Sequence, residues 1–96
     1  MSEIDSKEEF KQEIESEKVL IDYYAPWCSP CRQMEPVVEE LAEDRNVKKV
    51  NIDELPSVAE SQSVMALPTF AVYENGEEID RKTGAISKTK IENLYE

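Results

Sequence analysis

The chain has 96 residues and a mass of 11.0 kDa, which suits one small domain, residues 1–96, near the lower size limit for a self-sufficient core. Eleven basic against 22 acidic residues leave a formal charge of −11, which predicts that the chain binds neither nucleic acid nor anionic membranes. The sequence has no histidine, which excludes Ser-His and Cys-His dyads and histidine-ligated zinc. Any chemistry must therefore use carboxylates, amines, hydroxyls or the two cysteines.

The N-terminus, residues 1–10, has neither the basic region nor the apolar stretch of a secretory signal. No apolar run approaches the roughly 20 residues that cross a bilayer. We therefore expect a soluble, cytoplasmic protein. In that reducing compartment two cysteines are not expected to form a static structural bridge, which favours redox or metal chemistry.

Hydrophobic periodicity and turn signals predict alternating helices and strands. Ser6 and Glu9 fit a capping box, with Phe10 and Ile14 four residues apart on one helical face. In chain order the predicted elements are a helix at 7–16, a strand at 19–25, a helix at 28–43, a strand at 47–53, a short helix at 56–61, strands at 70–73 and 78–82 joined by Asn75-Gly76, and a closing helix after Ser87. The strand at 19–25 is almost wholly apolar, which is typical of a strand covered on both faces.

The two cysteines lie in Trp27-Cys28-Ser29-Pro30-Cys31, where the predicted central strand ends and the long helix begins. A helix N-terminus presents unpaired N–H groups and partial positive charge, so a thiol there ionises readily and becomes a nucleophile. Cys28 is the better placed of the two. Cys31 lies within reach on the first turn, where it can attack a mixed disulfide and release the product.

Metal binding is the alternative for this pair, as half of a tetrathiolate site. A closed zinc site needs four ligands, and the sequence supplies only two soft ones. A metal or iron–sulfur module would therefore need two chains, each contributing Cys28 and Cys31. A static, inert disulfide is a further alternative, but it is not expected in a reducing compartment.

The sequence resembles the thioredoxin family over residues 4–95. The matching segments, in order and at similar spacing, are Asp22-Tyr-Tyr-Ala-Pro-Trp-Cys-Ser-Pro-Cys31, Met34, Pro36, Asn51-Ile-Asp53, Leu67-Pro-Thr69, Asn75-Gly76 and Gly84-Ala85. The resemblance implies a thioredoxin-like α/β fold, with a mixed central sheet flanked by helices on both faces. Ser29 replaces the usual glycine, Tyr24 stands where many bacterial members have a second tryptophan, and the first strand is barely present. Ser29 keeps open a glutaredoxin-like or more oxidising disulfide exchanger.

The same resemblance implies a dithiol–disulfide oxidoreductase that acts on protein disulfides and is recharged by a thioredoxin reductase. We expect it to act as a monomer, with the Cys28–Cys31 pair as its redox centre and no other cofactor or metal. Trp27, Ser29, Pro30, Leu67, Pro68, Gly84 and Ala85 are the expected substrate-binding residues, Pro68 with a cis peptide bond. An ordinary trans proline at the start of a strand is the alternative for Pro68.

Asp22 is unusual because it interrupts an apolar strand six residues before Cys28. Burial there would raise its pKa. In the family, the matching carboxylate accepts a proton from the resolving thiol, and its lysine partner aligns with Lys49. Asp22 on a half-exposed strand face and Lys49 as a solvated strand lysine are the alternatives.

Charge is distributed unevenly along the chain. Arg32 is the only charge between Ala25 and Met34, and residues 61–73 and 83–87 carry none, whereas residues 1–17 carry seven acids. In a thioredoxin-like fold the three neutral segments converge around Cys28. The sequence therefore predicts an uncharged docking face ringed by acidic surface; coincidence together with a need for solubility is the alternative.

Overall fold

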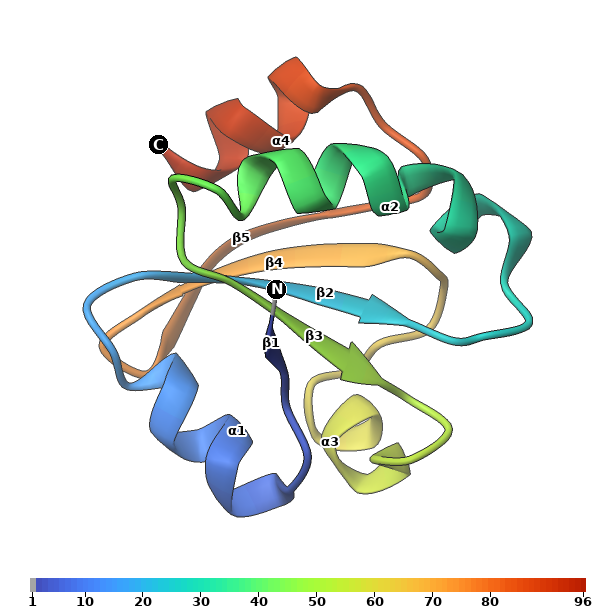
Figure 1. Cartoon of the computed structure of the whole chain (residues 1–96). Coiled ribbons are helices and arrows are strands. Elements are labelled where there is room, and N and C mark those ends of the chain that lie inside the picture. Colours follow the sequence, from blue (N-terminus) through green and yellow to red (C-terminus); the bar gives the residue numbers. More distant parts are fainter. Residues whose placement is uncertain (1) are drawn as a thin grey trace.

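The computed structural model describes residues 2–96 and has one sheet with helices on both faces (Figure 1). In chain order the elements are β1 (Ser2–Glu3), α1 (Lys7–Ile14), β2 (Val19–Tyr24), α2 (Ser29–Leu41), β3 (Val47–Asn51), α3 (Pro56–Ser61), β4 (Thr69–Glu74), β5 (Glu77–Thr83) and α4 (Lys88–Tyr95). This confirms the predicted α/β fold. The strand that the sequence pattern did not indicate as an element is β1, which is only two residues long.

The sheet has the strand order β1-β3-β2-β4-β5. The β1, β3 and β2 strands run parallel, as the long helical crossover between β2 and β3 requires. The β4 strand is antiparallel to both β2 and β5, so the sheet is mixed. Asn75 and Gly76 connect β4 to β5 with φ angles of 53° and 91°, the left-handed geometry predicted for this tight hairpin turn.

The two faces of the sheet carry separate cores. Helices α1 and α3 cover one face and α2 and α4 the other (Figure 1). Along β2, Val19, Ile21 and Tyr23 pack in the first core, whereas Leu20 packs in the second with Met34. Alternate residues of a strand point to opposite faces, so Asp22 shares the α2/α4 face with Leu20. The central strand is thus covered on both sides, as its apolar sequence predicts.

Several element ends differ from the sequence-based bounds by one or two residues. The β3 strand ends at Asn51 and not at residue 53, because the Asn51 side chain accepts the Asp53 N–H at 2.9 Å and its carbonyl accepts the Leu55 N–H at 3.0 Å. The α1 helix ends at Ile14, two residues early. Its N-terminus is capped as predicted, since the Ser6 hydroxyl accepts the Glu9 N–H at 3.0 Å.

Candidate active site at the start of helix α2

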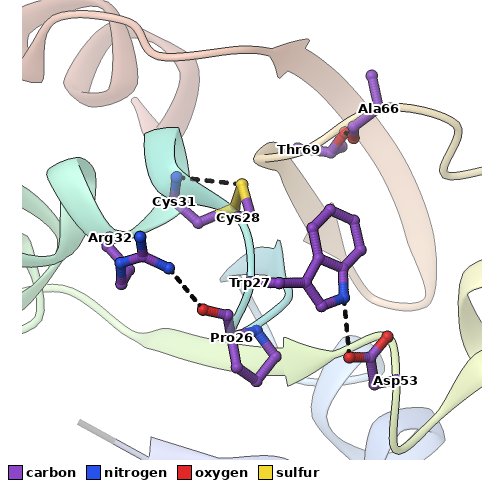
Figure 2. The surroundings of a disulfide bond; sticks show 8 residues. All are labelled: Pro26, Trp27, Cys28, Cys31, Arg32, Asp53, Ala66 and Thr69. Atoms are coloured by element: carbon purple, nitrogen blue, oxygen red, sulfur yellow. Dashed lines mark hydrogen bonds between the residues drawn. A yellow bond between two sulfur atoms is a disulfide. The ribbon is translucent and has the colours of Figure 1, made fainter.

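The two cysteines lie at the junction of β2 and α2. Cys28 is the N-cap of α2, and Cys31 lies in its first turn. The two residues form a disulfide, with their Cα atoms 5.2 Å apart. The Cys28 sulfur also accepts the Cys31 backbone N–H at 3.2 Å (Figure 2). The sulfur of Cys28 therefore occupies the position where a side-chain cap normally accepts an unpaired helix N–H.

The loop that carries Cys28 is held by two side-chain hydrogen bonds. The Trp27 indole N–H donates to Asp53 Oδ2 at 3.0 Å, and the Arg32 guanidinium donates to the Pro26 carbonyl at 2.8 Å. Figure 2 shows these bonds on opposite sides of the loop. Sequence reasoning did not single out Asp53 or Arg32 as site residues. The available signal for Asp53 was its place in the Asn51-Ile-Asp53 segment directly after β3.

An open groove of about 380 Å³ runs beside the disulfide. Its lining residues are all uncharged: Trp27, Cys28, Ser29, Pro30, Ile52, Val64, Met65, Ala66 and Leu67. Residues from two of the three neutral segments therefore meet here, as the charge distribution predicts. Trp27 is 66% exposed and Met65 is 93% exposed, so two large apolar side chains stand in solvent beside Cys28. Sequence analysis did not identify Met65, although it lies within the neutral run 61–73.

The third neutral segment lies next to Pro68. The Leu67–Pro68 peptide is cis, as the family resemblance implies. Pro68 is buried, and its carbonyl accepts the Gly84 N–H at 2.8 Å. Gly84 has a φ of 88°, where a side chain would be strained, and the exposed Ala85 follows it. Pro68, Gly84 and Ala85 are not among the residues that line the groove. They adjoin it through Leu67, the lining residue that precedes Pro68 in the chain.

Asp22 and Lys49 are direct partners in the register between β2 and β3. Asp22 is only 5% exposed, which places the carboxyl inside the molecule and not on a wet strand face. Burial raises the pKa of Asp22 to about 7; the nearby Lys49 charge lowers it, and Glu35 and Glu3 raise it further. A carboxyl with such a pKa gains and loses a proton near neutral pH, and Asp22 lies on the sheet face beneath α2.

This arrangement can carry two electrons on paired sulfurs without another redox group. Both cysteines are buried, with Cys28 5% and Cys31 6% exposed, but only Cys28 is among the residues that line the open groove. Because the two cysteines are bonded to each other, the state described here offers no free thiolate to a shared metal site. The arrangement matches dithiol–disulfide exchange, in which one sulfur meets the substrate and the other completes the exchange.

Comparison with known proteins places the whole architecture in one family. The family model Thioredoxin matches residues 2–96. Thioredoxin 1 of Synechococcus elongatus is 43% identical over 93 residues, covering 91% of this chain and 87% of that protein. Thioredoxin of Chlamydia trachomatis is 38% identical over 97 residues, covering 98% of this chain and 95% of that protein.

Solved structures agree with this placement. Plasmodium falciparum thioredoxin superposes with a TM-score of 0.92 at 32% identity, covering 99% of this chain and 96% of the other. Oxidised mitochondrial thioredoxin 3 from Saccharomyces cerevisiae gives a TM-score of 0.90 at 32% identity, covering 99% and 92% of the two chains. These likenesses do not favour a metal module or a glutaredoxin-like exchanger. With its Cys28–Cys31 disulfide at the start of α2, the chain belongs to the thioredoxin family and is a thiol–disulfide oxidoreductase.

Proposed function

We propose that the chain reduces disulfides in other proteins, with Cys28 as the attacking residue and Cys31 as the resolving residue. The observation that carries this assignment is the asymmetry of the pair: Cys28 lines the groove and caps α2, whereas Cys31 lies in the first turn of α2 and is not among the lining residues. In the reduced protein, the Cys28 thiolate gains from the same Cys31 N–H that its sulfur already accepts. A hydrogen bond to an ionised acceptor is about twice as strong as a neutral one, so this contact favours the thiolate.

The reaction proceeds through one covalent intermediate. The Cys28 thiolate attacks one sulfur of the substrate disulfide, the substrate S–S bond breaks, and its other sulfur leaves as a thiolate that takes up a proton. Cys31 then passes its proton to Asp22 and attacks the Cys28 sulfur. The Cys28–Cys31 bond forms, and the second substrate sulfur leaves as a thiol after protonation. Asp22 then releases its proton, which returns it to the carboxylate form. The substrate has gained two electrons and two protons; the cysteine pair has lost two electrons, the Cys31 proton passed to Asp22 and the proton that Cys28 gave up when it ionised.

Asp22 and Lys49 support the second step. The buried Asp22 carboxyl has a pKa of about 7, which suits exchange of a proton with a thiol near neutral pH. Lys49, its neighbour on β3, favours the ionised carboxylate and thus the state that accepts the proton. Asp22 therefore acts as the base, and the positive charge of Lys49 lowers the pKa of Asp22.

The groove binds the substrate segment around its disulfide. Trp27, Ser29, Pro30 and Leu67 line it, and the backbone of Leu67 pairs with an extended substrate strand. Pro68 fixes the backbone next to Leu67, and Gly84 and Ala85 extend the contact surface beyond the groove; the support is the hydrogen bond from the Gly84 N–H to the Pro68 carbonyl. The lining is uncharged and mostly apolar, so affinity comes mainly from burial of apolar surface.

The partners follow from this cycle. Each turnover leaves the pair oxidised, so a reductase must return two electrons, and the pair itself serves as the redox group without a bound cofactor or metal. We propose that residues 1–96 act as a single domain and a monomer in the cytoplasm, where disulfides formed in substrates need reduction. Among residues 2–96, none of the helices is both long and apolar enough to span a bilayer.

Reduction of insulin with dithiothreitol as electron donor tests this function, with precipitation of the freed chains as the readout. The unmodified chain should accelerate precipitation well above dithiothreitol alone, and Cys28→Ser should remove the acceleration. Ser57→Ala, an exposed change on α3, is the matched control and should behave like the unmodified chain. A rate equal to dithiothreitol alone for the unmodified chain, or undiminished activity of Cys28→Ser, would contradict the proposal.

A further inference from the structure

A row of three charged residues crosses the sheet beneath α2. Glu3 of β1 pairs in register with Lys49 of β3, and Lys49 pairs with Asp22 of β2. Residues in one register row share a face, so Lys49 stands between two carboxylates. The backbone fixes this row, because the Ile4 N–H donates to the Lys49 carbonyl at 2.9 Å. The two-residue strand β1 thus brings a charged group to the neighbourhood of Asp22.

Tyr24 connects the members of this row. It lies two residues beyond Asp22 on the same face of β2. Its hydroxyl donates to Glu3 Oε2, and the Lys49 Nζ lies 4.1 Å from the centroid of its ring. Burial, followed by the hydrogen bond to Glu3, raises the pKa of Tyr24, so the hydroxyl keeps its proton and remains a donor. Tyr24 also packs against the cluster that contains Cys28 and Cys31.

The position of the Lys49 ammonium matters because its stem is flexible. A lysine ammonium is strongly hydrated, and a half-buried lysine can turn its charge into solvent unless something holds it. An aromatic face attracts a cation within about 6 Å of its centroid, and Lys49 meets this condition on Tyr24. The Tyr24 ring therefore gives the ammonium a fixed place on the sheet face that carries Asp22.

We infer that Tyr24 is a positioning residue for proton transfer at Asp22: its ring holds the Lys49 ammonium, and Glu3 fixes the ring through the hydroxyl. The inference rests on the proposed role of Asp22 as the base. Lys49 is the charge that lowers the pKa of Asp22, against the opposing effects of burial, Glu35 and Glu3. Holding Lys49 in place therefore keeps Asp22 ionisable at a pH where Cys31 must lose its proton.

The groups around Asp22 come from several elements and define what the test must separate. Lys49 faces it from β3, Glu3 from β1 and Glu35 from α2. Cys31 lies in the first turn of α2. On the side of Asp22 away from β3, its register partner is the uncharged Phe70 of β4. Glu54 acts on Tyr24. Lys49 is the only positive group among them. If its ammonium moves away, the pKa of Asp22 must therefore rise.

The test is the carbon NMR titration of the Asp22 carboxyl in the full, oxidised chain. Lys49→Met should raise the midpoint by about one pH unit, the low end of the effect of a close opposite charge. Tyr24→Leu removes the ring and should reproduce at least about half of that rise. Tyr24→Phe keeps the ring, loses only the bond to Glu3, and should give a smaller rise; because it is nearly isosteric, it also guards against misfolding.

Two further variants distinguish positioning from packing. In a Lys49→Met background, Tyr24→Leu should cause no additional rise, because a residue that acts through Lys49 has nothing left to act on. Tyr95→Leu is the matched control: the Lys18 Nζ lies 4.8 Å from the Tyr95 ring centroid, near the opposite end of β2, and removing that ring should leave the Asp22 midpoint unchanged. In the cysteine-exchange reaction, the pH profile of mixed-disulfide resolution should shift upward with the Asp22 midpoint in Tyr24→Leu.

An unchanged Asp22 midpoint in Tyr24→Leu, or an equal rise in the Lys49→Met background, would overturn the inference. The titration needs no substrate, so failure of the positioning role can be told apart from failure of the proposed function. Insulin reduction intact in the unmodified chain with an unmoved midpoint in Tyr24→Leu would reject the positioning role alone. Absence of insulin reduction in the unmodified chain would reject the proposed function, and the positioning role with it.

Discussion

Replacing Asp22 with asparagine should stabilise the oxidised protein in a strongly pH-dependent way. Asp22 is 5% exposed, and burial raises its pKa from the ordinary 3.8 to about 7. A buried carboxylate costs free energy that a neutral carboxamide of the same shape does not. The gain from Asp22→Asn should therefore depend on whether the native carboxyl is ionised.

The sign follows from proton linkage. Below pH 3.8 the carboxyl is protonated in both folded and unfolded chains, so it contributes no pH dependence. Between pH 3.8 and about 7 only the folded protein binds the proton, and its stability falls by about 1.4 kcal/mol per pH unit. Above about pH 7 both states are ionised, and the loss levels off at about 4 kcal/mol. Asp22→Asn should escape this loss.

Urea unfolding at a series of pH values from 3 to 9, monitored by Trp27 fluorescence, measures the difference between Asp22→Asn and the unmodified chain. Other carboxylates titrate in both proteins and cancel in this difference. The difference should rise between pH 4 and 7 to about 4 kcal/mol and then remain constant. A difference that is independent of pH across this range would refute the buried, raised-pKa carboxyl.

Further predictions address the groove and the second step. Asp22→Asn should slow resolution of the mixed disulfide near neutral pH by up to about 100-fold, and the deficit should shrink as the pH approaches the ordinary thiol value of about 8.5, measured by single-turnover kinetics. Met65→Ser should raise KM for a protein substrate about fivefold, because apolar contact with the substrate is lost. The control is a small aromatic disulfide that is too short to reach Met65: its reduction rate shows whether the chemical step itself has changed. Raising the salt concentration should speed reduction of an acidic substrate and slow that of a basic one. At 0.1 M salt the Debye length is about 10 Å, so salt screens the long-range forces that act during encounter but has little effect on an uncharged contact face. An identical salt response for both substrates would place charges inside the contact face.

The sequence predicts those parts of the fold that local patterns determine. The apolar run of β2, the capping residues Ser6 and Ser87, and the Asn75-Gly76 turn each have short-range physical causes, and each lies where expected. The register of β2 with β3 was available only through the family resemblance, which aligned Asp22 with Lys49. Element ends were less predictable, because the ending of β3 depends on how the Asn51 side chain folds back on the next turn.

Contacts between distant segments were beyond the sequence patterns. A two-residue strand such as β1 has no periodicity to detect, so the bond between Tyr24 and Glu3, 21 residues apart, had no local signal. The bond between Trp27 and Asp53 joins two loops in the same way. The exposure of Met65 depends on how the loop before Pro68 runs, which composition does not encode. The neutral character of the groove was predictable, because it depends only on which segments lack charge.

The most direct test of the central claim is to trap the mixed disulfide. Cys31→Ser and Cys28→Ser are each incubated with a protein disulfide substrate, and covalent adducts are measured by mass spectrometry without reductant. Cys31→Ser should accumulate a one-to-one adduct through Cys28, because attack proceeds and resolution cannot. Cys28→Ser should form little, since its remaining thiol, Cys31, is not among the residues that line the groove. Equal adduct in both variants, or more in Cys28→Ser, would contradict the assignment of Cys28 as the attacking residue.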